Sequence, residues 1–449
     1  MAKRAYECSE CKEVYARWAG KCPNCGQFAT LEEVDPSVLA ASAAPSTKAG
    51  SRADRISSGD TPETINSIST KSYDRLQTGI GEFDRVLGGG IVPGGIMLLA
   101  GTPGVGKSSL FLTVANSIAK SGKKVLIVSG EETKGQIKSR ADRIGANSDN
   151  LYLLSEGNLN NIIGHIGTLR PDVVIVDSIQ TILSDSSDGR IGSVGQVSEV
   201  AQQLTQVGKT MNIPMLLIGH VTKDGNIAGP RVVEHLVDVV LYLEDNRDSP
   251  LRLLRGVKNR YGATDEVGCF EHAEEGLLEV ADPSGFFLSQ HEEGTVGFAN
   301  SVIVEGNRAL PIEVQALVTA TNMPNPRRVN HGLDNARVLM IQAILEKHGG
   351  LRLNNKDIYV STTGGLSTKD TSIDASIAIA LISSYKNVPP PEGSIFLGEL
   401  SLTGELRPPR NARKRIMEAR RLGYTNIYVP MAPEGCSNVR TVLDLINLV

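Results

Sequence analysis

The sequence predicts an α/β fold in which a mostly parallel sheet, wrapped by helices, carries a nucleotide-phosphate loop. Residues 101–108, GTPGVGKS, match the pattern G-x-x-x-x-G-K-[ST] between an apolar run at 96–100 and a helix-like segment at 109–120. Short apolar runs alternate with helix-length segments, as is typical of parallel sheets, at 124–128, 151–154, 173–176, 215–218 and 239–243. A length of 449 residues suggests about three structural units.

Composition narrows the class of protein. Hydrophobic residues make up 40% and charged residues 21% of the chain, which is ordinary for a globular protein. The net charge of −4 excludes a uniformly basic surface, so any contact with nucleic acid needs a local patch or channel. No signal-peptide pattern opens the chain, and no apolar run approaches the ~20 residues of a membrane span. We therefore expect a cytoplasmic protein with no membrane contact.

Four of the six cysteines lie within the first 25 residues, as two C-x-x-C pairs: Cys8 with Cys11 and Cys22 with Cys25. This spacing predicts a tetrahedral zinc site in a ribbon spanning residues 1–35, because each pair directs two thiolates at one ion. Two disulfides are the alternative, which a reducing compartment disfavours. Docking and nucleic-acid contact are equally open roles for the ribbon. Residues 36–70, rich in Ser, Ala, Thr and Pro, have the composition of a flexible linker.

The loop after residue 100 is expected to bind ATP. Glycines let the backbone curl so that successive N–H groups point at phosphate oxygens. The Lys107 side chain should reach the β- and γ-phosphates, and the Ser108 hydroxyl should ligate Mg²⁺. We expect the nucleotide contacts to come from the whole loop, Gly101, Thr102, Pro103, Gly104, Val105, Gly106, Lys107 and Ser108.

Ligands of parallel sheets bind at the carboxyl ends of the strands, so the residues that follow the apolar runs are informative. Asp177 follows the run 173–176, a Walker B arrangement suited to holding Mg²⁺. Glu131 or Glu132 is positioned to activate the attacking water as a general base. His220, after the run 215–218, is a candidate sensor of the γ-phosphate or an ordinary structural histidine.

Basic residues follow in two polar loops and one extended segment. The loop 184–195 contains Arg190, and the segment 221–234 contains Lys223 and Arg231; each is a candidate grip on a nucleic-acid backbone or an ordinary solvated loop. Lys258 and Arg260 fall on one face of an extended segment. Such a pair can bind phosphate groups, including those of ATP bound by a neighbouring subunit. The alternative is an ordinary solvent-exposed basic pair, which is common on edge strands.

Together these motifs resemble the RadA (Sms) family of bacterial DNA repair proteins. The resemblance covers the whole chain and rests on the Cys₄ ribbon, the segment 78–84, GTPGVGKSS, the segment 129–132, the segment 219–225 and KNRYG at 258–262, where Tyr261 replaces the usual phenylalanine. It implies a RecA-like P-loop ATPase domain at 71–280 that forms a hexameric ring. Lys258 and Arg260 would then reach the adjacent subunit's ATP, and alignment with the RecA core favours Glu131 as the base.

The same resemblance implies an activity. RadA-type proteins act on single-stranded and branched DNA during homologous recombination, together with a RecA-type recombinase, and drive branch migration by hydrolysing ATP. The two polar loops would line the central channel of the ring. Residues alone indicate an ATPase with candidate phosphate-gripping loops, whereas the ring, recombination and branch migration come from the family.

The region 281–449 resembles the α+β Lon-protease domain, with matching stretches at 297–321 and 356–430. Lon-type peptidases use a Ser-Lys pair, and here Ser372 falls at the nucleophile position with Asp374 in place of a flanking glycine. Arg413 falls at the position of the lysine and cannot accept a proton. We expect an inactive peptidase fold kept for oligomerisation or DNA contact. The predicted DNA-binding or solvated basic patch comprises Arg407, Arg410, Arg413, Lys414, Arg415, Arg420 and Arg421.

Two alternative functions follow from the same features. An ATPase joined to a Lon-like domain is also the architecture of an ATP-dependent protease, which ATP-dependent digestion of casein would reveal. A KaiC-like regulatory ATPase is the other alternative, and autophosphorylation on Ser or Thr with labelled ATP would favour it.

Overall fold

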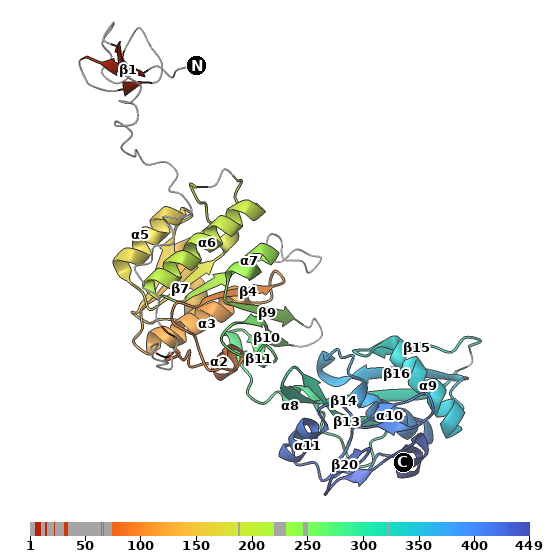
Figure 1. The fold of residues 1–449 in the computed structure, drawn as a ribbon. Helices are drawn as coiled ribbons and strands as arrows, with labels where there is room; N and C mark the ends of the chain where they lie inside the picture. Colours follow the sequence, from red (N-terminus) through yellow and green to blue (C-terminus); the bar gives the residue numbers. More distant parts are fainter. Residues whose placement is uncertain are drawn as a thin grey trace. The chain divides into compact units, whose positions relative to one another are not determined.

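Figure 1 shows the computed structural model, which describes residues 5–9, 14–15, 22, 31–34, 64, 66, 74–186, 189–219, 230–245, 250–321 and 323–449. The chain divides into two compact units, residues 1–71 and 72–449. In the first unit, β1 (Ala5–Cys8) pairs antiparallel with both β2 (Val14–Tyr15) and β3 (Leu31–Val34). Most of the predicted linker at 36–70 lies outside the described residues.

The second unit contains a nine-stranded sheet of order β12-β11-β10-β9-β4-β8-β7-β5-β6. Strands β9 to β6 in that order are parallel, and β10, β11 and β12 extend the sheet antiparallel. The strands are β4 (Ile96–Gly101), β5 (Val125–Ser129), β6 (Leu151–Ser155), β7 (Val173–Asp177), β8 (Met215–Ile218), β9 (Val239–Asp245), β10 (Leu251–Asn259), β11 (Val267–Ala273) and β12 (Gly276–Glu279). The predicted alternation of strands and helices is confirmed.

Helices cover both faces of this sheet, which explains why β4 is apolar and buried along its whole length. Successive side chains of a strand point to opposite faces, and Leu98 and Leu99 accordingly belong to two different hydrophobic clusters. The helices are α2 (Gly81–Leu87), α3 (Lys107–Lys120), α4 (Lys134–Arg143), α5 (Leu159–Leu169), α6 (Val194–Met211) and α7 (Pro230–Leu236), with a 3₁₀ turn, η1 (Ile179–Thr181).

A second sheet follows, of order β15-β16-β14-β13-β17-β20-β21, beside a two-stranded ribbon β18-β19. The strands are β13 (Phe298–Glu305), β14 (Arg308–Ala320), β15 (Arg328–His331), β16 (Lys356–Thr362), β17 (Ser394–Phe396), β18 (Glu399–Leu400), β19 (Leu406–Arg407), β20 (Asn426–Val429) and β21 (Ser437–Asn438). Antiparallel and parallel pairs mix in this sheet, as in α+β folds.

The helices around the second sheet are α8 (Ser284–Phe287), α9 (Asn335–Gly349), α10 (Asp374–Lys386), α11 (Ala412–Arg421) and α12 (Val442–Leu448), with the turns η2 (Thr363–Gly365) and η3 (Thr371–Ile373). Helix α10 is buried from Asp374 to Ser383 and forms the centre of this core. The two sheets lie on either side of the boundary predicted between residues 280 and 281, and the boundary itself stays a prediction.

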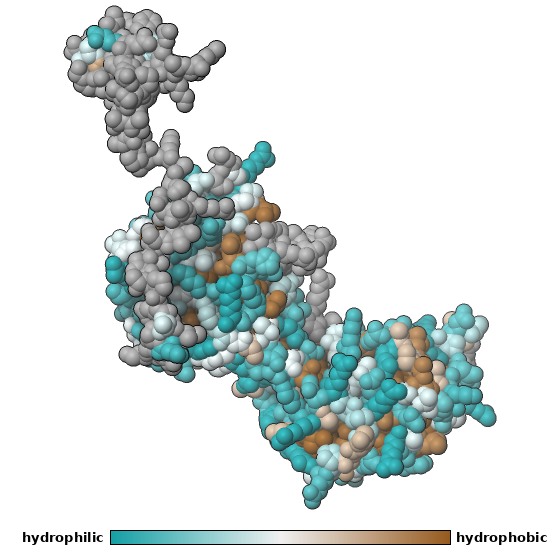
Figure 2. Space-filling model, viewed as in Figure 1, coloured by the Kyte–Doolittle hydropathy of each residue, from teal (hydrophilic) through white to brown (hydrophobic). Residues whose placement is uncertain are grey.

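Hydrophobic residues lie in separate patches on the face that Figure 2 shows, between larger hydrophilic areas. Within the described part of the chain, no helix combines the length and the apolar character needed to cross a membrane.

Candidate nucleotide site

The phosphate-loop motif connects the end of β4 to the start of α3, which confirms the predicted order of strand, loop and helix. Gly104 and Gly106 have φ angles of 82° and 108°, in the left-handed region that glycine adopts without strain. A Cβ added at Gly106 would lie 2.7 Å from the Leu277 Cδ1 atom of β12. Any other residue at position 106 would therefore strain the backbone and displace the Leu277 side chain.

Lys107 is folded into the loop. Its side chain is 5% exposed, and its Nζ donates hydrogen bonds to the carbonyl oxygens of Gly101 at 2.8 Å and Thr102 at 3.0 Å. Burial lowers the pKa of the Lys107 ammonium, and the nearby Asp177 carboxylate opposes that shift. The loop thus holds its cation with its own carbonyl groups.

Asp177 and Ser108, the two predicted magnesium ligands, are in contact. The Ser108 side chain hydrogen-bonds the Asp177 carboxylate, which lies at the carboxyl end of β7. Burial raises the pKa of Asp177, with the two neighbouring glutamates adding to the shift, while Ser108 and Arg140 oppose it. Hydroxyl and carboxylate oxygens are the hard donors that Mg²⁺ prefers, so these two residues fit that ion.

Glu131 and Glu132, the two candidate bases, have different partners. The Ser178 hydroxyl donates to the Glu131 carboxylate at 3.0 Å. The Glu132 carboxylate forms an ion pair with Arg140 of α4. Sequence analysis did not single out Ser178 or Arg140; Ser178 was signalled only by its place directly after Asp177.

Lys258 and Arg260 come together at the connection between α7 and β9. The Lys258 Nζ donates to the carbonyl oxygens of Glu234 at 2.6 Å and Val237 at 2.8 Å. The Arg260 guanidinium lies 3.3 Å from the carboxylate of Asp238, which is 3% exposed. Burial and the neighbouring Arg260 lower the pKa of Lys258. The structure therefore clusters the two predicted cations around Asp238, a residue that the sequence motifs did not reveal.

This cluster lies at the opposite end of the strands from the phosphate loop. The second carboxylate oxygen of Asp238 accepts a hydrogen bond from the backbone N–H of Ile96, the first residue of β4, at 3.0 Å. The loop begins at Gly101, the last residue of β4, and five strand steps of about 3.3 Å separate these ends by roughly 16 Å. Lys258 and Arg260 therefore do not contact the phosphate loop of their own chain.

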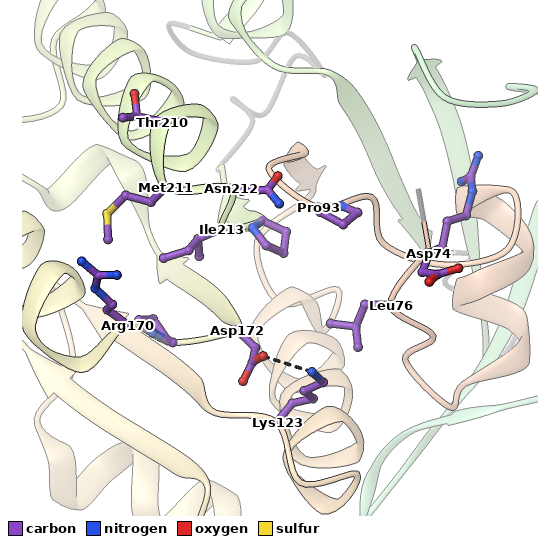
Figure 3. A pocket seen from close by; sticks show the side chains of 13 residues that line it. Asp74, Leu76, Pro93, Lys123, Arg170, Asp172, Thr210, Met211, Asn212 and Ile213 are labelled. Carbon is purple, nitrogen blue, oxygen red and sulfur yellow. Dashed lines mark hydrogen bonds and ion pairs between the residues drawn. The ribbon is translucent and has the colours of Figure 1, made fainter. Parts of the chain in front are cut away.

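A wide cavity also opens at the amino ends of these strands (Figure 3). Its lining includes Pro93, Ile213 and the ion pair between Lys123 and Asp172, whose charged atoms are 3.2 Å apart. These residues precede β4, β8, β5 and β7, whereas the phosphate loop follows β4. The cavity is therefore not the nucleotide site.

Three family models match successive regions of the chain. Residues 6–33 match the family model described as a rubredoxin metal binding domain, residues 62–226 the AAA domain, and residues 335–433 subunit ChlI of Mg-chelatase. The chain is 44% identical over 431 residues to the DNA repair protein RadA of Mycobacterium tuberculosis (strain CDC 1551 / Oshkosh), covering 96% of this chain and 88% of that protein. The chain belongs to the RadA family.

The chain is also similar to two further proteins. The DNA repair protein RadA of Bacillus subtilis (strain 168) is 41% identical over 430 residues, which cover 96% of this chain and 93% of that protein. The crystal structure of the RadB recombinase aligns with 46% of this chain and 99% of its own, at 24% identity and a TM-score of 0.37. Membership in the family confirms the predicted fold class: a RecA-like α/β ATPase with an N-terminal zinc ribbon and a C-terminal Lon-like domain.

Two of the four predicted zinc ligands lie within the described residues. Cys8 and Cys22, one from each C-x-x-C pair, are both buried, at 0% and 1% exposure. Buried cysteine sulfurs, one from each pair, fit a structural zinc site. Cys11 and Cys25 lie outside the described residues, as do His220, Lys223 and the side chain of Arg231.

In the Lon-like domain, the predicted nucleophile Ser372 is 3% exposed and donates its hydroxyl to Asp370. Asp370 in turn accepts from Arg415 at 2.7 Å. Arg415 is 2% exposed, whereas Arg413 is exposed on α11. Arg415 is therefore linked to the predicted serine, because both side chains bind Asp370. Arg413 points to solvent from the same helix.

The predicted basic patch needs correction for the same reason. Arg415 is inside the protein and does not belong to a surface patch. Arg421 forms ion pairs with Asp282 at 2.9 Å and Glu418 at 2.7 Å, so these two carboxylates compensate its charge. A basic run alone does not show which of its residues face inward, and here α11 buries Arg415 together with Ile416 and Ala419.

Replacing Arg415 by alanine should lower the free energy of unfolding by about 3–5 kcal/mol, because the largely buried Asp370 carboxylate would lose its cation. The matched control is Arg413→Ala on the same helix, which should change stability by no more than about 0.5 kcal/mol. Urea denaturation of the full chain, followed by circular dichroism, measures both. Equal effects of the two substitutions would contradict this account of α11.

Proposed function

We propose that this chain is a DNA-dependent ATPase of homologous recombination and recombinational repair, which drives branch migration on single-stranded DNA. The single observation that carries the proposal is the similarity, at 44% and 41% identity over 96% of the chain, to two proteins named DNA repair protein RadA. Lys107 in the phosphate loop, with Asp177 and Glu131 at the ends of neighbouring strands, is chemically consistent with an ATPase. RecA-type recombinases and branched DNA are the expected partners, with DNA repair as the cellular process.

The proposed roles follow from the contacts of the nucleotide site. Lys107 exchanges the carbonyl oxygens of Gly101 and Thr102 for phosphate oxygens, which restore the full charge that burial disfavours. Ser108 and Asp177 would hold Mg²⁺, which when bound neutralises phosphate charge. Glu131, held by Ser178, orients and deprotonates the attacking water. Glu132 instead anchors Arg140.

The two glutamates provide a matched test of this assignment. Glu131→Gln should lower ATP turnover by about 100-fold or more while ATP binding persists, because an amide cannot accept the proton. Glu132→Gln should change turnover by less than about threefold, because it breaks only a partly exposed ion pair. Phosphate release and nucleotide affinity are measured for both. If Glu132→Gln carries the larger loss in turnover, the assignment of the base is reversed.

Lys258 and Arg260 are proposed to act on ATP bound by the neighbouring subunit. They lie at the far ends of the strands from their own phosphate loop, and Arg260 is 55% exposed. A head-to-tail ring, hexameric in our proposal, would bring this end of one subunit to the nucleotide of the next. Each site would then be completed only by assembly.

Contact with DNA is proposed for the loop that follows the catalytic strand β7. Arg190 is exposed, and Ile191 beside it, three residues before α6 begins, is 60% exposed. A cation for the phosphates and an apolar side chain for the bases suit single-stranded DNA. The zinc ribbon, held by Cys8, Cys11, Cys22 and Cys25, is a second candidate contact.

The decisive test measures ATP hydrolysis by the purified full chain with and without single-stranded DNA, and then branch migration on a three-strand recombination intermediate. We expect DNA to stimulate hydrolysis and the branch point to move only with hydrolysable ATP. Casein digestion in the same preparation tests the Lon-like alternative, for which the buried Ser372 offers little access. If single-stranded DNA leaves the rate of ATP hydrolysis unchanged and the branch point does not move, the proposed motor activity is refuted.

A further inference from the structure

A buried ion pair joins the two sheets of the unit 72–449. Glu82, in the first turn of α2, is 2% exposed and pairs with Arg308, the first residue of β14, which is 9% exposed. Their positions are 226 residues apart in the chain. The Glu82 carboxylate also accepts the backbone N–H of Cys269 in β11 at 2.8 Å. Arg85 also pairs with Glu82 at 3.3 Å, but its side chain is 46% exposed, so Arg308 is the buried cation of this carboxylate. Breaking a buried charge pair is costly.

Arg308 also binds three backbone carbonyl groups of the first sheet. Its Nη1 donates to the Val267 oxygen at 3.1 Å, and its Nη2 donates to the Ala281 oxygen at 2.9 Å and the Val280 oxygen at 3.4 Å. Residues 280 and 281 directly follow β12, and Val267 begins β11. One guanidinium thus fixes α2, the start of β11 and the end of β12 together.

The elements that Arg308 fixes pack against the nucleotide site. Leu277 of β12 lies against Gly106, where an added Cβ would come within 2.7 Å of its side chain. Phe83 of α2 packs edge-to-face on Phe111 of α3, the helix that begins at Lys107, with ring centroids 6.2 Å apart. The contacts from Arg308 to the phosphate loop therefore run through β12. Arg308 binds the carbonyl groups of residues 280 and 281 just after this strand, and Leu277 within it lies against Gly106.

The neighbouring hairpin turn holds Arg308 in register. Glu305, at the end of β13, forms an ion pair with Arg255 of β10 at 3.1 Å. The backbone N–H of Asn307 donates to the Asp265 carbonyl oxygen. Glu305, Asn307 and Arg308 thus each contact the segment 255–281, which leaves the Arg308 guanidinium little freedom to move.

We propose that Arg308, a residue of the Lon-like domain, is a positioning residue for the phosphate loop of the ATPase domain. It acts by holding β12 so that Leu277 braces Gly106 and thereby sets the entry of α3. The proposal rests on the proposed function, since positioning matters only if the loop binds ATP. It assigns the Lon-like domain a part in the ATP site of its own chain.

The test compares full-chain Arg308→Ala with Arg328→Ala. Arg328 also donates to backbone carbonyls, those of Leu353 and Lys356, but only within the second sheet. Arg308→Ala should weaken binding of a non-hydrolysable ATP analogue about tenfold and speed amide exchange in residues 101–108 about tenfold. Arg328→Ala should leave both quantities within about twofold of wild type.

Two further variants keep the test decisive if Arg308→Ala folds poorly. Leu277→Ala leaves the ion pair intact and should reproduce the faster exchange of the loop amides. Arg308→Lys retains a charge for Glu82 but loses the fork that reaches several carbonyls, so its loss of affinity should be intermediate. The proposal would be overturned if Leu277→Ala kept the affinity and the loop exchange of the wild type. It would also be overturned if Arg328→Ala changed both quantities as much as Arg308→Ala does. Analogue binding without hydrolysis in the wild type would refute the proposed function alone, because affinity and exchange still report on Arg308.

Discussion

Replacement of Lys107 by alanine is expected to lower ATP hydrolysis by about 100- to 1,000-fold. Lys107 is 5% exposed and hydrogen-bonded to two carbonyl oxygens of its own loop, so the folded loop already holds a cation where the phosphates are expected. Alanine removes that charge from a site in which Asp177 and Glu131 contribute only negative charge. Nucleotide binding should weaken together with turnover, since the ammonium contacts the phosphates in both the ground state and the transition state.

The matched control for Lys107→Ala is Lys120→Ala, at the exposed last residue of the same helix. It should leave hydrolysis and binding unchanged, apart from a small effect on the end of α3. Phosphate release and the binding of a fluorescent ATP analogue are measured for both variants. If Lys107→Ala hydrolyses ATP at the wild-type rate, the loop 101–108 is not the hydrolytic site.

Replacement of Arg260 by alanine is expected to lower turnover by about 1,000-fold while ATP binding by the isolated subunit stays intact. The physical reason is position, because Arg260 lies beside Asp238 and the first residue of β4, away from the loop of its own chain. The fold should survive the change, since Asp238 keeps Lys209 and the Ile96 N–H as partners. Arg170→Ala, an exposed arginine at the same end of the strands, is the matched control.

Mixing the two inactive variants distinguishes action between subunits from action within one. In a mixed ring, the loop of an Arg260→Ala subunit can face the intact arginine of a Lys107→Ala subunit. Random mixing would restore about one interface in four, so activity should reappear on mixing. Mixed samples as inactive as their components, in rings shown to exchange subunits, would contradict sharing of the site.

Local patterns predicted much of this site. The strand, loop and helix around Lys107 follow from an apolar run, a glycine-rich pattern and a helix-forming segment, all contiguous in the chain. Asp177 and the pair Glu131 and Glu132 were predicted from their place after apolar runs, because parallel strands end at one side of a sheet. Such signals are readable from sequence because each depends on a few neighbouring residues.

Other features depended on packing between distant segments. Periodicity alone did not tell Arg413 from Arg415, since the register of α11 against Asp370 decided which arginine is buried. Nor did adjacency separate Glu131 from Glu132, whose partners Ser178 and Arg140 come from different elements. In each case two similar side chains compete, and only the surrounding contacts distinguish them.

The sequence by itself determined the phosphate loop, the alternation of strands and helices, and the family to which the chain belongs. Only the tertiary structure decided that Arg260 stands at the opposite end of β4 from the loop, and that Arg308 reaches Glu82 across 226 positions. The physical reason is that a motif records local backbone and side-chain requirements. The partner of a buried charge is instead chosen by how whole sheets pack, where the desolvation of each charge must be offset.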